Sequence, residues 1–299
     1  MNIQTFSVIG LGSMGLGAAL SIKRAGHQVF GADPAAARIA LWQEAGGKLA
    51  DPTRDAPLSD AVISVVLNAD QTRQVFFGPD GWARHMRKGA TIVSCATVAP
   101  AVARELEALA KDYGLYYLDA PISGGAVKAA QGQLSIMASG VPEAFDGAEA
   151  ALSAMAAVVH RLGDMAGPGS AMKSVNQLLA GVHIAAMAEA LGLAVSQGLD
   201  LTRVLEVISA SAGNSWMFEN RAPHVIDADY SPRSSVNIWP KDLGIISDIA
   251  RDAGLNLPLT KSALDQFRAA AEAGFGHEDD AAVSKIVAQS AGLSLPGDA

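Results

Sequence analysis

The feature that most constrains the fold of this chain is a glycine-rich motif, Gly10-Leu11-Gly12-Ser13-Met14-Gly15. It directly follows a short apolar segment, residues 6–9, that is typical of a buried strand, and it leads into a helical run, residues 16–25. In that setting the glycines allow a tight turn, close approach of the backbone to a pyrophosphate, and close packing of helix on strand. The unpaired N–H groups at the helix start would bind the phosphates. The motif therefore predicts a dinucleotide-binding unit, with all six motif residues at the cofactor.

A carboxylate lies where such units hold the ribose of the dinucleotide. Residues 28–32 read as a second strand, which ends at Asp33, about 20 residues after the motif. A carboxylate there can accept hydrogen bonds from the ribose hydroxyls and would repel a 2′-phosphate, so the sequence favours NAD over NADP. In the alternative, Asp33 only caps the helix that begins at Pro34, and the nearby Arg38 keeps NADP open.

Strands and helices continue to alternate through the first half of the chain. Strands are expected at residues 61–67, 91–96 and 115–118, with helical segments at 35–45, 70–88 and 100–113. This order predicts a parallel, doubly wound α/β sheet. Ligands of such sheets bind beyond the carboxyl ends of the strands, so Asn68 and Thr97 are expected at the cofactor, with helix capping as the alternative for each.

Two further strands, residues 132–139 and 158–162, and a helix at 142–155 complete a first domain, residues 1–165. Before them comes the turn Ser123-Gly124-Gly125. A serine beside two glycines exposes several backbone N–H groups with no side chains in the way, which is a small nest suited to a carboxylate. These three residues are therefore predicted to bind an anionic substrate, and a simple tight turn is the alternative.

A long apolar helix, residues 168–197, carries one lysine near its start. Asn176 and Gln177 follow Lys173 by three and four positions, so on a helix all three side chains share one face. A lysine on an apolar helix is partly desolvated, which lowers its pKa and suits it to general acid-base catalysis. The sequence therefore predicts a catalytic group of Lys173, Asn176 and Gln177. In the alternative, the lysine reaches from the helix end to solvent.

The rest of the chain has no strand pattern, so the second domain, residues 166–299, is expected to be all-helical. Its further helices are expected at 201–211, 215–226, 240–253, 258–272 and 281–292. Asn214, at a helix start, is either a substrate contact or a buried cap. Lys241, beside an apolar helix, is either a cofactor contact or a solvated helix end. Residues 277–280 match no zinc or calcium spacing, so no metal site is expected there, and they read as a solvated helix entry.

Composition limits the class of protein. At 299 residues the chain exceeds what one core usually serves, which agrees with two domains. Apolar residues make up 50% and charged ones 17%, with a mean hydropathy of +0.23. This composition suggests more buried surface than a monomer of this length needs, so it predicts an oligomer. The net charge of −8 and the lack of a basic cluster argue against nucleic acid and anionic membrane surfaces as partners.

The single Cys95 cannot form an internal disulfide, which fits a reducing, cytoplasmic compartment. Residues 178–195 are long enough to raise the question of a membrane span. His183 and Glu189 interrupt them, so a soluble core helix is expected instead.

Four ordered motifs together resemble the β-hydroxyacid dehydrogenase family, which includes 3-hydroxyisobutyrate dehydrogenase, tartronate semialdehyde reductase and 6-phosphogluconate dehydrogenase. They are the glycine motif at 10–15, Asp119-Ala120-Pro121-Ile122-Ser123-Gly124-Gly125, the segment 167–177 around Lys173, and Lys241-Asp242-Leu243. The resemblance spans nearly the whole chain. It implies a Rossmann-type first domain, a helical second domain for substrate binding and oligomerisation, and NAD-dependent oxidation of a small hydroxy acid.

The resemblance also implies residue roles. Lys173 would be the general acid-base, Ser123 to Gly125 would hold the substrate carboxylate, and Thr97 and Lys241 would lie near the nicotinamide. The assembly would be a homodimer or a homotetramer.

Two places depart from the family pattern. Gln177 occupies the position where members usually have asparagine, and residues 94–96 read Ser-Cys-Ala where aspartate and serine are more usual. Segments 133–140, 176–183 and 214–221 resemble most closely the members that oxidise a four-carbon sugar acid at C2. Members that use 3-hydroxyisobutyrate, tartronate semialdehyde or succinic semialdehyde stay as alternatives, as does an NAD-binding scaffold without turnover.

Overall fold

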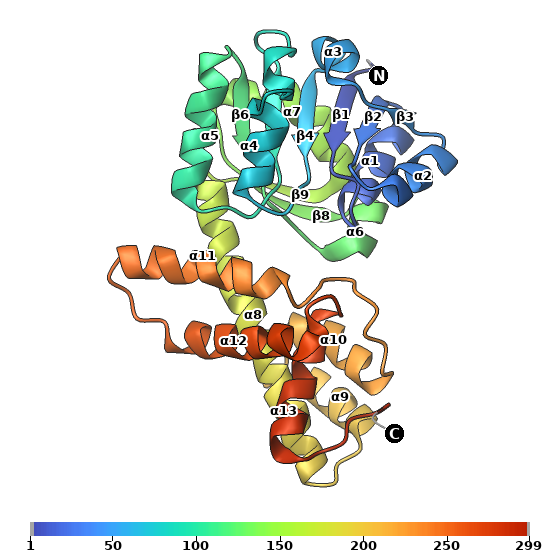
Figure 1. The fold of residues 1–299 in the computed structure, drawn as a ribbon, viewed down its shortest axis with the longest axis vertical. Helices are drawn as coiled ribbons and strands as arrows, with labels where there is room; N and C mark the ends of the chain where they lie inside the picture. Colours follow the sequence, from blue (N-terminus) through green and yellow to red (C-terminus); the bar gives the residue numbers. More distant parts are fainter. Residues whose placement is uncertain (1–2, 298–299) are drawn as a thin grey trace. The chain divides into compact units, whose positions relative to one another are not determined.

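The structure is a computed structural model that describes residues 3–297, and it divides into two compact units (Figure 1). The first unit ends at Lys173 and the second begins at Ser174. Each unit has its own hydrophobic core and is described by itself.

A six-stranded parallel sheet forms the centre of the first unit. Its strands lie in the order β3-β2-β1-β4-β5-β6, so the order reverses between β1 and β4, as in doubly wound folds that bind a dinucleotide. The predicted fold class is confirmed. The strands are β1 Thr5–Ile9, β2 Gln28–Ala32, β3 Lys48–Leu49, β4 Ala61–Ser64, β5 Thr91–Ser94 and β6 Tyr116–Asp119.

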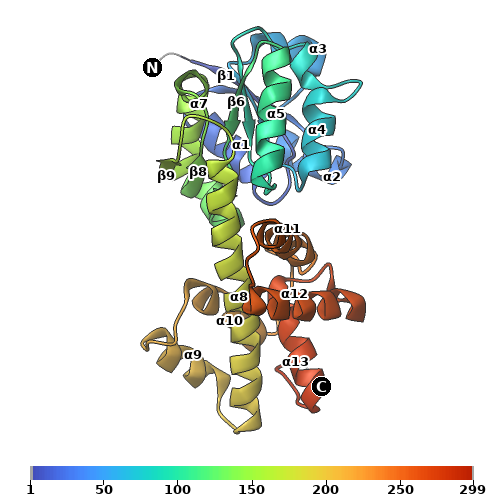
Figure 2. The ribbon, with the colours of Figure 1, turned by 90° about the vertical axis from the view of Figure 1, so that its left-hand side faces the viewer.

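Alternating side chains of these strands supply two cores, one on each face of the sheet. Phe6 and Val8 of β1 point into the first core, whereas Ile9 points into the second. Helices α1, α2, α6 and α7 pack on the first face, and α4 and α5 lie side by side on the other (Figure 2). These helices are α1 Gly15–Arg24, α2 Ala36–Glu44, α4 Ala69–Phe77, α5 Pro100–Asp112, α6 Gly125–Gln131 and α7 Pro142–Met155.

The last two predicted strands of this unit form, but in a separate three-stranded sheet. It consists of β7 Ile122–Ser123, β8 Leu134–Ala138 and β9 Ala156–Arg161, with β7 antiparallel and β9 parallel to β8. Several short elements were not predicted, among them the two-residue strands β3 and β7, the one-turn helix α3 Pro52–Asp55, and α6. Each is too short to carry a hydrophobic period.

The second unit is helical, as predicted. Its helices are α9 Leu201–Ser209, α10 Trp216–Ile226, α11 Ile238–Asp252, α12 Pro258–Ala270 and α13 Val283–Ala291, around the longer part of α8 Pro168–Ser196. Trp239 and Phe267 stack in the core with ring centroids 5.4 Å apart. By length and composition alone α8 could cross a membrane, and 44% of its apolar 18-residue window is buried within the protein.

The expectation of a solvated segment at residues 277–280 holds for the exposed His277 but is wrong for the two aspartates. Asp279 and Asp280 are fully buried rather than solvated. Asp280 accepts a hydrogen bond from Arg221 Nε at 2.5 Å and one from Trp239 Nε1 at 3.0 Å. Asp279 pairs with His224 Nδ1 at 2.8 Å. The acidic pair therefore ties the segment before α13 to α10, because buried carboxylates must find partners.

Candidate active site

The glycine motif forms the tight turn between β1 and α1 that the sequence predicts. A Cβ atom on Gly15 would lie 1.8 Å from the carbonyl oxygen of Gly10, so this position cannot carry a side chain. A Cβ atom on Gly12, by contrast, would meet no protein atom within 4 Å. The first turn of α1 has no side-chain cap. The motif thus has open space beside uncapped N–H groups, which fits the pyrophosphate of a dinucleotide.

Asp33 holds the glycine motif in place. Its Oδ2 atom accepts a hydrogen bond from the Leu11 N–H at 2.7 Å, and its Oδ1 atom accepts one from the Ala35 N–H at 2.8 Å. The alternative that Asp33 caps a helix beginning at Pro34 is true only in part. Asp33 binds the Ala35 N–H group, but α2 begins at Ala36 and its N-cap residue is Ala35. Each carboxylate oxygen keeps further acceptor capacity, so a ribose contact by Asp33 stays a prediction.

Asn68 and Thr97 follow β4 and β5. The Asn68 side chain accepts a hydrogen bond from the Gln71 N–H at 2.9 Å and caps α4, so its capping alternative is realised. Thr97 is half-buried and does not cap α5, whose N-cap is Ala99. Contacts of these two residues with a cofactor stay predictions.

Lys173 is buried beside the predicted substrate loop. Its side chain lies in the first unit, is 7% exposed, and donates a hydrogen bond from Nζ to the Ile122 carbonyl oxygen at 2.9 Å. Ile122 directly precedes Ser123. Gly124 and Gly125 have backbone φ angles of +134° and +78°, which residues other than glycine rarely adopt. The structure therefore brings Lys173 next to the Ser123 to Gly125 loop, and the alternative of a solvated lysine is wrong.

A buried carboxylate fixes the start of the helix that carries Lys173. Asp119, at the end of β6, is 1% exposed and accepts hydrogen bonds from the Gly167 N–H at 3.0 Å, the Ser170 N–H at 2.8 Å and the Ser170 hydroxyl at 2.7 Å. Burial raises the pKa of Asp119, although the bonds from Ser170 and Gly167 oppose this. The carboxylate meets the orphan N–H groups and the positive dipole end of α8. It thereby positions Lys173 one turn further along.

Sequence reasoning missed this role of Asp119. An acidic residue at the end of a buried strand, together with a helix start that offers no aspartate or asparagine cap of its own, is the signal that could have found it.

Four polar side chains meet in the second unit. Gln177 is 8% exposed, and its Nε2 atom donates to Asp242 Oδ2 at 2.5 Å. Asn176 Nδ2 donates to Gln177 Oε1 at 3.0 Å. The other oxygen of Asp242 pairs with the ammonium of Lys241. The structure therefore brings together three predicted residues, Asn176, Gln177 and Lys241, and joins to them Asp242, which belongs to the Lys241 motif but was given no role from the sequence.

Asn214 makes local contacts. Its Nδ2 atom donates to the Ser209 carbonyl oxygen at 3.2 Å and to Glu219 Oε1 at 2.8 Å, so it links the end of α9 to α10. Ser215 is the cap of α10, since its hydroxyl accepts from the Phe218 N–H at 3.0 Å. A substrate contact by Asn214 stays a prediction.

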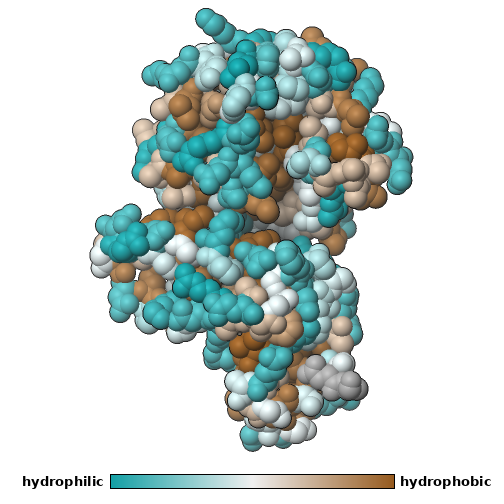
Figure 3. All heavy atoms as spheres, in the orientation of Figure 1, coloured by the Kyte–Doolittle hydropathy of each residue, from teal (hydrophilic) through white to brown (hydrophobic). Residues whose placement is uncertain are grey.

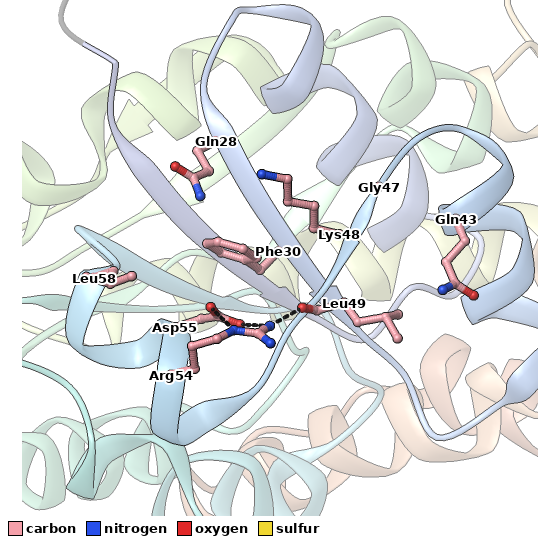
Figure 4. Close-up of a pocket in the computed structure, with 9 residues that line it drawn as sticks. All are labelled: Gln28, Phe30, Gln43, Gly47, Lys48, Leu49, Arg54, Asp55 and Leu58. Atoms are coloured by element: carbon pink, nitrogen blue, oxygen red, sulfur yellow. Dashed lines mark hydrogen bonds and ion pairs between the residues drawn. The ribbon is translucent and has the colours of Figure 1, made fainter.

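A separate groove of about 570 Å³ lies at the edge of the large sheet (Figure 4). It includes Gln28, the first residue of β2, whereas Asp33 follows the other end of that strand. Arg54 on its wall is already paired with Asp55 at 2.7 Å. The groove is therefore distinct from the predicted cofactor site.

Other kinds of chemistry find little support. Burial raises the pKa of Cys95 to about 12, so its thiolate is not available as a nucleophile at neutral pH. Within residues 3–297, no group of three histidine, cysteine or acidic side chains could hold a metal ion.

Comparison with protein families identifies the chain. Residues 5–163 match the NAD-binding domain of 6-phosphogluconate dehydrogenase, and residues 167–287 match the NAD-binding domain of NADP-dependent 3-hydroxyisobutyrate dehydrogenase. The chain belongs to the 3-hydroxyisobutyrate dehydrogenase-like family. It is therefore an NAD(P)-dependent hydroxyacid dehydrogenase, as the sequence motifs predict, and its fold is that of the family.

Individual relatives of this dehydrogenase are similar over nearly their whole length. An L-threonate dehydrogenase of Escherichia coli O6:H1 is 47% identical over 97% of this chain and 96% of its own. That of Cupriavidus necator is 46% identical, with 99% of both chains covered. A crystal structure of a 3-hydroxyisobutyrate dehydrogenase from Salmonella typhimurium is 47% identical, covers 95% of this chain and 99% of its own, and superposes with a TM-score of 0.90.

Proposed function

We propose that this dehydrogenase oxidises L-threonate at C2 to 2-oxo-tetronate, with NAD as cofactor. The observation that carries the proposal is the 46–47% identity, over almost the full length, to relatives that are named L-threonate dehydrogenase. The Salmonella relative has a different substrate in its name at the same identity. The polar pair Asn176 and Gln177 favours a polyhydroxy acid over the branched, apolar 3-hydroxyisobutyrate.

The residues present divide the reaction between them. Bound NAD supplies the acceptor for the hydride that leaves the carbinol carbon. Lys173, whose side chain is buried beside the loop, accepts the hydroxyl proton as the general base. The Ile122 carbonyl holds Lys173 Nζ beside the loop of Ser123 to Gly125, which binds the substrate carboxylate. Hydride and proton thus leave one oriented substrate in two directions.

A panel of hydroxy acids tests the substrate. We expect the highest kcat/KM, measured by the absorbance of NADH as it forms, with L-threonate rather than 3-hydroxyisobutyrate or L-serine. For tartronate semialdehyde and succinic semialdehyde the consumption of NADH is followed instead. A higher kcat/KM with any other member of the panel would contradict the proposed substrate.

Asp33 is proposed to set the preference for NAD. We expect Asp33→Ala to lower the ratio of kcat/KM for NAD to that for NADP by about tenfold or more, because a hydrogen bond to a charged group contributes about 1.5 to 3 kcal/mol. Asp112→Ala, at an exposed end of α5, is the matched control and should leave the ratio unchanged. An unchanged ratio in Asp33→Ala would mean that this carboxylate only holds Leu11 and Ala35.

A homo-oligomer formed through the helical unit is part of the proposal, as is a cytoplasmic location. Val175, Leu179 and Leu193 project from one side of α8 with exposed fractions of 56%, 50% and 65%. Figure 3 shows apolar patches between hydrophilic residues on the face of this unit that it presents. Large apolar side chains exposed along one side of a helix are typical of an interface. A monomeric molar mass by light scattering would contradict the assembly.

A further inference from the structure

We propose that Asn176, and not Gln177, reads the hydroxyl groups of the substrate beyond the reacting one, and that Asp242 and Gln177 are positioning residues for it. The inference rests on the proposed function in one respect, since it takes the substrate to be a hydroxy acid bound beside Lys173.

Asp242 fixes the orientation of the Gln177 amide. A carboxylate can only accept hydrogen bonds, so the group 2.5 Å from Asp242 Oδ2 must be the Nε2 donor of Gln177. Asp242 is 2% exposed and Gln177 is 8% exposed, so water does not compete effectively for this bond. The Oε1 atom of Gln177 therefore has a single direction.

That oxygen in turn orients Asn176. Gln177 Oε1 accepts a hydrogen bond from Asn176 Nδ2 at 3.0 Å, which assigns the Asn176 amide as firmly as Asp242 assigns that of Gln177. Both ends of the Gln177 amide are then engaged. Asn176 is only half-buried, and its Oδ1 atom and second N–H group take no part in these two bonds. Asn176 is thus the amide of the pair that is placed to meet a ligand hydroxyl.

The chain of bonds also ends on a cation. The second oxygen of Asp242 pairs with Lys241, the side chain predicted to lie at the nicotinamide. One buried carboxylate therefore sets the direction of a residue on the cofactor side and of a residue on the substrate side. A lysine or an amide held in this way loses less entropy when a ligand binds.

Substrate analogues that lack one hydroxyl group test the inference. The best hydroxy acid of the panel is compared with its deoxy analogues, which for L-threonate are 2,4-dihydroxybutanoate and 2,3-dihydroxybutanoate. In the wild type we expect at least one analogue to lose about tenfold or more in kcat/KM, as expected when a polar group of the site is left unpaired. In Asn176→Ala this loss should shrink to less than about threefold, because the group that reads the hydroxyl is gone.

Asp242→Asn separates positioning from contact. Asparagine can present either an oxygen or an NH₂ group, so the amide of Gln177 is free to turn over. We expect this variant to lose part of the discrimination, mainly through KM. Asp248→Asn, which changes an exposed aspartate on the same helix, is the control and should keep it.

Three outcomes would overturn the inference. The first is full discrimination in Asn176→Ala with its loss in Gln177→Ala, which would assign the contact to Gln177. The second is a best substrate without a second hydroxyl group, and the third is a wild type that does not discriminate. A best substrate that is a polyhydroxy acid other than L-threonate would contradict the proposed function alone, and the comparison would proceed with that acid.

Discussion

Lys173→Met is expected to reduce kcat by roughly 10²-fold or more, the usual scale for the loss of a general base. Methionine has a long, flexible and apolar side chain, so it can occupy the buried position without leaving a cavity. What disappears is the amine that the Ile122 carbonyl holds beside the Ser123 to Gly125 loop. Steady-state kinetics measure kcat, and a fluorescence titration with NADH should show dinucleotide binding near that of the wild type.

Lys111→Met is the control for this variant. Lys111 is exposed on α5, so its replacement should leave kcat unchanged. Turnover of Lys173→Met near the wild-type rate, with intact dinucleotide binding, would contradict the role of Lys173 as general base. A loss of dinucleotide binding in this variant would instead assign Lys173 to the cofactor site.

Arg221→Met is expected to destabilise the helical unit by about 3 to 5 kcal/mol, because it leaves the buried Asp280 carboxylate without its cation. Asp280 is 0% exposed and Arg221 is 9% exposed, so water cannot replace the lost partner. Burial already raises the pKa of Asp280, and the charge of Arg221 opposes that rise. The midpoint of urea unfolding, followed by the circular dichroism of the helices, measures the effect.

Two further variants show whether the unpaired charge of Asp280 causes the loss of stability. Arg203→Met removes an exposed ion pair with Glu206, in which the side chains are 77% and 65% exposed, and should cost less than about 1 kcal/mol. Adding Asp280→Asn to Arg221→Met removes the unpaired charge and should recover part of the loss. Equal shifts of the midpoint in Arg221→Met and Arg203→Met would mean that the buried network contributes no more than a surface pair.

The architecture could be predicted from the sequence because its long elements carry strong local signals. A strand, a glycine motif and a helix in immediate succession leave few alternatives. Helix α7 begins at Pro142, a residue that is favoured at the first position of a helix. The two-residue strands β3 and β7 could not be predicted. They form because neighbouring strands supply hydrogen-bond partners, and a sequence of two residues carries no signal of that pairing.

The sequence singled out Lys173 and the turn at Ser123, which the structure places side by side, but it did not show the residues that support them. Lys173 and the turn at Ser123 are recognisable from local chemistry. The partners of Asp119 at the start of α8 lie 48 to 51 residues away, and Gln177 lies 65 residues from Asp242, so only the folded chain shows these pairs.

At residues 277–280 distant partners made a sequence-based prediction wrong. A run of charges is usually solvated, but Arg221 and His224, more than 50 residues earlier, draw Asp279 and Asp280 into the core.

The anchor at Asp119 has a consequence for how enzymes of this kind diverge. Lys173 is held by the end of a sheet strand and belongs to the unit that carries the glycine motif, whereas Asn176, Gln177 and Asp242 belong to the helical unit. Mutations that accumulate in the helical unit can therefore change which molecule is accepted while the lysine keeps its support. On the roles proposed for these residues, inheritance of the reaction and inheritance of the preference for one hydroxy acid become separable within one chain.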